Sequence, residues 1–98
     1  MNRRTKALDI SKKVKMTVWE RDRHRCILCE SSSAIPNAHY ISRAKSGLGI
    51  EQNIVTLCMD CHRRLDQTTE RKELLCRVKN YLDRFYPNFT DDMRRYKK

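Results

Sequence analysis

Four of the five cysteines in this 98-residue chain fall into two pairs with the same spacing. Cys26 and Cys29 form one Cys-x2-Cys knuckle, and Cys58 and Cys61 form the other. This spacing lets both thiolates of a knuckle face one ion, and two knuckles supply the four sulfur ligands of a tetrahedral zinc site. We therefore expect a structural zinc ion that joins the knuckles. Redox-active or free thiols are the alternative, which two matched pairs argue against.

The interval between the knuckles is unusually long. It holds 28 residues, whereas about 15–20 usually separate the knuckles of a plain four-cysteine module. The insertion contains His39 and Asn53, two side chains that can do chemistry. The fifth cysteine, Cys76, lies outside both knuckles, and we interpret it as a small buried hydrophobe.

A second pair of candidate metal ligands follows the second knuckle. Asp66 comes four residues after His62, so on a helix the two side chains share one face. An imidazole and a carboxylate there could hold one divalent cation and leave room for water and a phosphate oxygen.

The composition points to a polyanionic partner. Lysine and arginine number 22 against 12 acidic residues, a net charge of +10. This excess predicts nucleic acid binding, mainly through phosphates, because charge without base-reading elements gives affinity rather than sequence choice. Only 39% of residues are hydrophobic, so a metal would help to stabilise so small a core.

Membrane insertion and secretion are not expected. The longest apolar run is the four residues Cys26–Cys29, whereas a membrane-spanning helix needs about 20. The basic N-terminus is followed by no apolar stretch, so we expect no secretory signal and a reducing cytoplasm.

The elements that must position these residues form a single domain over residues 1–98. We expect a loose basic arm at 1–10, a core at 11–66, a helix at 70–86 and a basic tail at 88–98. Ser11 is a suitable N-cap for a helix that ends near Asp22. In that helix Trp19 is expected to anchor the core, and an exposed indole that stacks on a base is the alternative.

Two short β-prone segments, 37–42 and 54–57, predict a hairpin. Both glycines lie in its connection, which indicates an unusual backbone conformation or a close approach of a ligand. A helix begins at the second knuckle. In the last helix the apolar residues follow helical spacing and are expected to face the core: Leu74, Leu75, Val78, Leu82 and Phe85.

Taken in order, these motifs resemble the HNH endonuclease family. The resemblance is carried by Cys26-x2-Cys29, Ala38-His-Tyr-Ile-Ser-Arg43, Gly47-Leu-Gly-Ile50, Asn53-Ile-Val-Thr-Leu-Cys58 and Met59-Asp-Cys61-His62. It is strongest to the small zinc-stapled members of phages and prophages, and it spans residues 14–66. It implies an α+β fold with a ββα-metal core, in a bacterial or phage-infected cell, that hydrolyses DNA and works alone or with a phage packaging or other partner protein.

The resemblance also implies roles for single residues. His39 would be the general base, since an imidazole titrates near neutral pH, and Asn53 would orient it. His62, with Asp66, would hold a catalytic Mg²⁺, Mn²⁺, Ni²⁺ or Zn²⁺, and the products would carry 5′-phosphate and 3′-hydroxyl ends. Nucleic acid contacts are expected from the basic residues around this site: Arg43, Lys45, Arg63 and Arg64.

One position departs from the family pattern. Family members often carry an acidic residue or a histidine before the general base, whereas this chain has Ala38. A zinc module that binds nucleic acid or protein without catalysis is therefore the rival function, whereas a redox or metal-storage protein fits the helical core and hairpin spacing poorly.

Each residue also has a plainer interpretation. His39 could be a hydrogen-bonded core histidine, and Asn53 a turn residue. His62 could complete a Cys3His zinc site, and Asp66 could pair with Arg63 at the surface.

Overall fold

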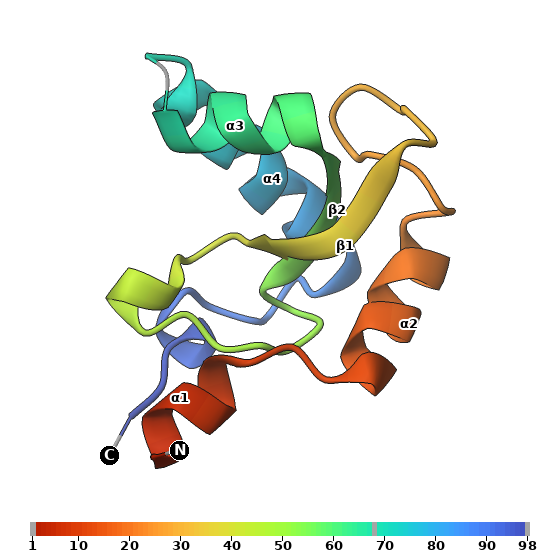
Figure 1. The fold of residues 1–98 in the computed structure, drawn as a ribbon. Helices are drawn as coiled ribbons and strands as arrows, with labels where there is room; N and C mark the ends of the chain where they lie inside the picture. Colours follow the sequence, from red (N-terminus) through yellow and green to blue (C-terminus); the bar gives the residue numbers. More distant parts are fainter. Residues whose placement is uncertain (1, 68, 98) are drawn as a thin grey trace.

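The computed structural model describes residues 2–67 and 69–97 and has a small α+β fold (Figure 1). In chain order its elements are α1 (Arg3–Leu8), α2 (Lys12–Arg21), β1 (Ala34–His39), the 3-10 helix η1 (Arg43–Lys45), β2 (Ile54–Cys58), α3 (Met59–Gln67), α4 (Arg71–Phe85) and the 3-10 helix η2 (Asp92–Arg94). The predicted α+β class is confirmed. In the part of the chain that the structure describes, no helix is long and apolar enough to cross a membrane.

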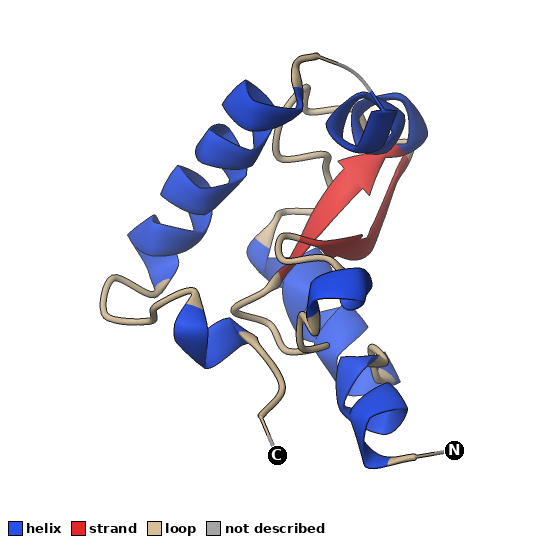
Figure 2. Cartoon of the chain, turned by 90° about the vertical axis from the view of Figure 1, so that its left-hand side faces the viewer, coloured by secondary structure: helices blue, strands red, loops and turns tan. Residues whose placement is uncertain are grey.

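The two strands form an antiparallel pair, and β2 leads directly into α3. His39 lies opposite Ile54, and the register is irregular between Ile35 and Ala38. Pro36 lies inside this irregular stretch, where a residue without an N–H group is tolerated. Every residue of β2 is buried, since α2 and α3 both contact the two strands. Figure 2 shows the strands lying among the helices.

The limits of two helices agree with the sequence prediction. The Ser11 hydroxyl accepts a hydrogen bond of 3.1 Å from the Val14 N–H and caps α2, and α4 ends two residues before Pro87.

The first strand is displaced from the predicted 37–42 to Ala34–His39. Beyond it, the Ile41 N–H bonds the side chain of Asn53 instead of a neighbouring strand.

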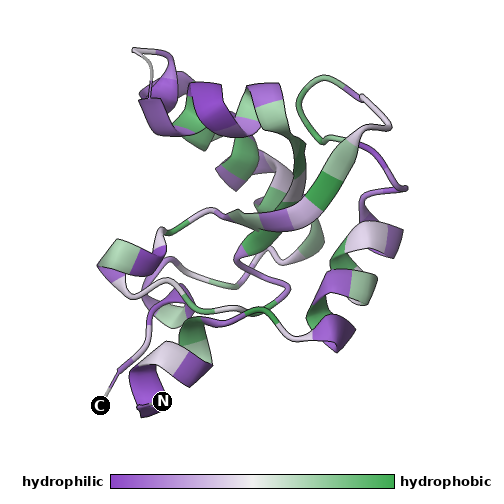
Figure 3. Ribbon diagram, in the orientation of Figure 1, coloured by the Kyte–Doolittle hydropathy of each residue, from purple (hydrophilic) through white to green (hydrophobic). Residues whose placement is uncertain are grey.

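The buried face of α4 is narrower than predicted. Leu74, Val78 and Leu82 are buried, but Phe85 is 46% exposed and Cys76 lies at the surface. The prediction that Cys76 is a buried hydrophobe is therefore wrong, because its place two residues after Leu74 turns it away from the apolar stripe. Apolar residues otherwise gather on the inner faces, and α3 is largely hydrophilic (Figure 3).

Residues Arg3–Leu8 form a docked helix, α1, where the sequence predicts a loose arm, and Met1 of that predicted arm lies outside the described residues. The Asn2 side chain caps α1 by accepting a bond of 2.7 Å from the Thr5 N–H. Leu8 is 1% exposed, and the Gly49 N–H donates to the Ala7 carbonyl at 3.0 Å. The basic side chains of the segment remain exposed, so their mutual repulsion does not prevent folding.

The basic tail is also packed against the domain. Arg94 is fully buried, and its Nε donates to the Gln52 carbonyl at 2.6 Å. Its Nη1 donates to Asp91 at 2.9 Å, and its guanidinium lies 5.4 Å from the centre of the Tyr40 ring and 5.5 Å from that of Phe89. The buried Arg94 thus helps to fix the segment predicted as a basic tail, together with a backbone hydrogen bond of 2.8 Å from the Tyr96 N–H to the Ser46 carbonyl.

The two glycines allow other backbone segments of the same chain to come close to them. Neither has a positive φ angle. A Cβ atom at Gly47 would lie 1.6 Å from the Ile41 carbonyl oxygen, and one at Gly49 would lie 2.1 Å from that of Asp9. The approaching group is therefore backbone rather than a ligand.

Replacing Gly47 by alanine should lower the free energy of unfolding by at least about 2 kcal/mol, in the upper part of the usual range for single substitutions. The cause is the collision with the Ile41 backbone, and urea unfolding measures it. The control is Ser46→Gly: Ser46 has a φ of 65°, which glycine adopts freely, so this variant should be at least as stable as the wild type. Equal stability of Gly47→Ala and the wild type would contradict the close approach.

Candidate functional site

Four cysteine sulfurs form a cluster that could hold a metal ion. Cys26 and Cys29 come from the turn after α2, Cys58 ends β2 and Cys61 lies in the first turn of α3. Their sulfur atoms all lie within 4.8 Å of one another, and those of Cys29 and Cys58 are 3.5 Å apart. Four sulfurs in this arrangement are consistent with a structural zinc ion.

Backbone hydrogen bonds shape the first knuckle. The Cys26 N–H donates to the Ser31 carbonyl at 2.9 Å, and the Glu30 N–H donates to the Cys26 carbonyl at 2.9 Å. Glu30 adopts a φ of 65° to close the turn. The Ile27 N–H then donates to the Thr56 carbonyl in β2 at 3.0 Å, which brings the first knuckle beside the second.

The sulfurs differ in their electrostatic surroundings. Burial raises the pKa of Cys26, but backbone hydrogen bonds outweigh it and lower the pKa to about 7. Burial raises the pKa of Cys61, and the neighbouring sulfurs raise it further. The cluster therefore resists carrying four negative charges by itself, and a divalent cation would remove that resistance.

His39 stands at the end of β1, half-buried, with one ring nitrogen engaged. Its Nε2 lies 2.9 Å from the Leu8 carbonyl oxygen. A carbonyl only accepts, so Nε2 carries the proton of the neutral ring and Nδ1 keeps a free lone pair. Burial lowers the pKa of His39 below the usual 6.5, and the charges of Arg43 and His62 lower it further, against the Leu8 hydrogen bond that raises it. The imidazole is therefore neutral at pH 7.

The end of α1 organises this histidine and a neighbouring arginine. The Leu8 carbonyl also accepts a hydrogen bond of 2.8 Å from Arg43, and Arg43 pairs with Asp9 at 2.8 Å. The guanidinium expected to hold a phosphate thus has partners within the chain. Sequence reasoning missed the part played by Leu8, since a backbone carbonyl carries no residue-type signature.

Asn53 is completely buried and holds both ends of the loop that follows His39. Its Oδ1 accepts from the Ile41 N–H at 2.8 Å. Its Nδ2 donates to the carbonyls of Leu48 at 2.8 Å and Ile41 at 3.1 Å. All the hydrogen-bonding capacity of the amide nitrogen is used, which an ordinary turn asparagine would not require.

His62 and Asp66 meet on one face of α3, as their spacing predicts. His62 Nδ1 lies 3.0 Å from an Asp66 carboxylate oxygen, and the side chains are 39% and 50% exposed. His62 is not part of the sulfur cluster found among the described residues, which disfavours the Cys3His alternative. Both line a pocket that Asn37 of β1 also lines.

Asn37 is a polar residue that the sequence reasoning missed. It is exposed, whereas Ala38 is 1% exposed and belongs to the core. Side chains alternate along a strand, so Asn37 rather than Ala38 lies on the side of β1 that carries the pocket. The alternation of side chains along a strand is the signal by which the sequence could have placed Asn37 on this side of β1.

The other predicted nucleic acid contacts are not gathered in one place. Arg63 lines the His62 pocket and pairs with Asp60 at 3.2 Å. Arg64 pairs with Glu70 at 2.7 Å, which raises the pKa of Arg64. Lys45 lies in a different groove, together with several basic residues: Arg71, Lys72, Lys79 and Arg95.

The fold and the cluster define a small α+β domain with a four-cysteine centre. No protein-family model matches the chain, and no curated protein matches it.

Replacing Cys58 by serine should remove about one equivalent of bound zinc and unfold much of the domain, because zinc binding is coupled to folding in such sites. Elemental analysis and circular dichroism measure the two effects. Cys76→Ser is the matched control: Cys76 lies at the surface outside the cluster, so metal content and stability should stay at wild-type values. A wild-type protein that is folded and metal-free would refute the site.

Proposed function

We propose that this protein is a metal-dependent endonuclease of the HNH type that hydrolyses phosphodiester bonds of DNA. The observation that carries the proposal is the placement of three residues on one β1–β2–α3 unit. His39 ends β1, Asn53 directly precedes β2, and His62 lies in the first turn of α3. His62 and Asp66 line one pocket with Asn37, which lies two residues before His39 on β1.

His39 is the base in this proposal. Its Nδ1 takes a proton from water, the water oxygen attacks phosphorus, and the bond from phosphorus to the 3′ oxygen breaks. The departing oxygen takes a proton from solvent water, which leaves 5′-phosphate and 3′-hydroxyl ends. The Leu8 carbonyl keeps hold of the Nε2 proton and stabilises the imidazolium that forms. Asn53 keeps the loop beside the base in place through its three side-chain hydrogen bonds.

The residues around His62 fit a divalent cation. An imidazole, a carboxylate and the Asn37 amide line one pocket, which is the mixed nitrogen and oxygen set that Mn²⁺, Ni²⁺ or Zn²⁺ accepts and that Mg²⁺ completes with water. A cation held by His62 and Asp66 would stabilise negative charge on the scissile phosphate. The exposure of both side chains leaves space for the phosphate.

The charge of the chain supports DNA as the substrate. The excess of 10 positive charges attracts a phosphate backbone without selecting a base sequence. Low intrinsic sequence specificity follows, and a partner protein would supply any target choice.

The second candidate is a zinc-stabilised module that binds nucleic acid without cutting it. The burial of Ala38, which is 1% exposed, favours this function, because it leaves only His62 and Asp66 as strong candidate ligands in a pocket that His39 does not line. Cleavage assays decide between the two.

The first such assay uses plasmid DNA with Mg²⁺, Mn²⁺ or Ni²⁺. The wild type should nick the plasmid, and His39→Ala should lose about 100-fold or more of that rate, as expected for a general base. A general base acts when it is deprotonated. Because the pKa of His39 lies below 6.5, the wild-type rate should rise with pH below 6.5 and should no longer change with pH near pH 7. Circular dichroism and zinc content check that the variant is folded. A rate that His39→Ala leaves unchanged would make the assignment wrong.

The second assay tests the cation site. Asp66→Asn should raise the divalent metal concentration needed for half-maximal cleavage by about 10-fold or more, since a ligand charge is lost. Asp60→Asn removes the same charge from the same helix, at a residue that pairs with Arg63, and should change it little. Equal shifts in the two variants would indicate a general charge effect instead of a ligand.

A further inference from the structure

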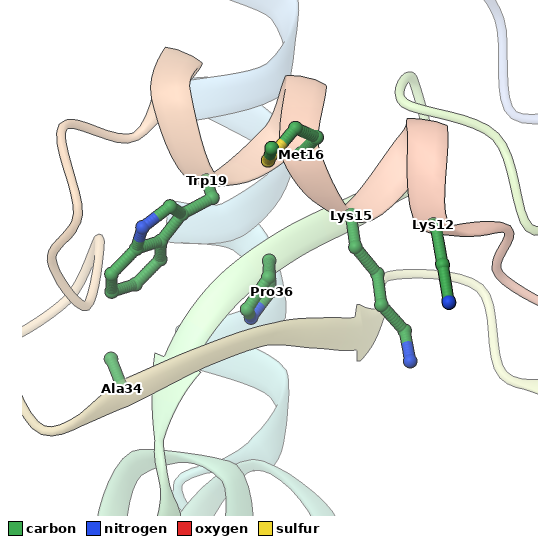
Figure 4. A pocket seen from close by; sticks show the side chains of 6 residues that line it. All are labelled: Lys12, Lys15, Met16, Trp19, Ala34 and Pro36. Carbon is green, nitrogen blue, oxygen red and sulfur yellow. The ribbon is translucent and has the colours of Figure 1, made fainter.

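A shallow apolar groove runs between α2 and β1. It is lined by four apolar residues and two lysines: Met16, Trp19, Ala34, Pro36, Lys12 and Lys15. Figure 4 shows Trp19 beside Ala34 at one end, Pro36 in the middle and the two lysine side chains toward the other end. Ala34 and Pro36 alternate along β1 with Ile35 and Asn37, which line the His62 pocket. The groove and that pocket therefore lie on opposite sides of the strand.

The indole at the apolar end of the groove stacks on a neighbouring ring. Trp19 stacks on His24 with ring centres 4.7 Å apart and planes 5° apart. His24 is itself held by Glu20, whose carboxylate lies 3.0 Å from its Nε2. Trp19 is only partly buried and lies outside the main core cluster, so the prediction that it anchors the core is wrong. A partly exposed, stacked ring pair is a platform for another flat ring.

The other end of the groove is cationic. Lys12 and Lys15 are exposed, and neither forms an ion pair with any residue in 2–67 or 69–97. No carboxylate lines the groove. Met16, 65% exposed, adds apolar surface between the indole and the lysines. An occupant must therefore offer a flat apolar part next to negative charge.

We infer that this groove binds an unpaired stretch of DNA, with a base stacked against Trp19 and its flanking phosphates on Lys12 and Lys15. Every base has a flat π face, and such platforms combined with basic grooves are how proteins hold single strands. The choice of DNA rests on the proposed function, whereas the groove itself does not depend on His39 or on a catalytic metal. The proposed nuclease would then prefer substrates with unpaired nucleotides.

Trp19 is the only tryptophan of the chain, so its fluorescence reports on this groove alone. The zinc-loaded wild type is titrated with a short oligodeoxythymidine, without added divalent metal so that no cleavage occurs. A loss of emission that saturates with DNA is expected. An abasic strand of equal length carries the same phosphates and should leave the emission nearly unchanged, and a perfectly paired duplex should quench less than the single strand. Equal quenching by the abasic strand would overturn the stacking.

Variants test the same contacts by fluorescence anisotropy of a labelled strand. Trp19→Ala should weaken binding about 5- to 150-fold, the equivalent of about 1–3 kcal/mol per stacked base, and Trp19→Phe should recover most of the loss. Lys15→Ala should lower the slope of log affinity against log salt by about 0.7, the value for one phosphate contact in a single strand. Lys13→Ala is the matched control, on α2 but outside the groove, and an equal effect there would overturn the assignment.

Three further results separate this inference from the proposed function. A protein that cuts plasmid DNA while single strands leave Trp19 emission unchanged would overturn the groove alone. Quenching by an acidic peptide or by RNA, with none by DNA, would overturn the choice of occupant. A protein that binds single strands through Trp19 but never cuts would support the groove and refute the nuclease.

Discussion

The gathering of four cysteine sulfurs within 4.8 Å is the constraint on which the rest of the structure depends. Cys58 ends β2 and Cys61 lies in the first turn of α3, so fixing these two sulfurs sets the direction in which α3 leaves the sheet. His62 is the next residue, and its position relative to β1 follows from the same constraint. The proposed site, with histidines from two elements, would therefore depend on the cluster even though no cysteine is assigned a part in its chemistry.

Buried polar groups supply much of the cohesion that an apolar core gives in larger domains. Asp22 is 5% exposed and accepts hydrogen bonds of 2.8 Å from the Thr56 N–H and the Tyr81 hydroxyl, which join α2, β2 and α4. Arg94 anchors the C-terminal segment in the same way. Not every basic side chain is available to a partner, because Arg94 is buried and Arg43 is paired with Asp9.

The sequence predicted the features that rest on local spacing. The two knuckles, the limits of α2 and the apolar stripe of α4 follow from periodicity and ligand geometry. Features that rest on distant contacts were not predictable. The hydrogen bond from His39 to the Leu8 carbonyl joins residues that are 31 positions apart. The α1 segment has no apolar pattern beyond Leu8 from which its packing against the domain could be predicted. Asn37 was missed because the predicted strand began there, whereas the real one begins three residues earlier at Ala34.

The alternation of side chains along β1 shows how four residues of one strand contribute to two surfaces. Ile35 and Asn37 lie toward the His62 pocket, while Ala34 and Pro36 form part of the floor beside Trp19. A shift of register by one residue would exchange the two sets. The register irregularity between Ile35 and Ala38 falls in the stretch that supplies side chains to both surfaces, and His39 lies beyond it, opposite Ile54 of β2.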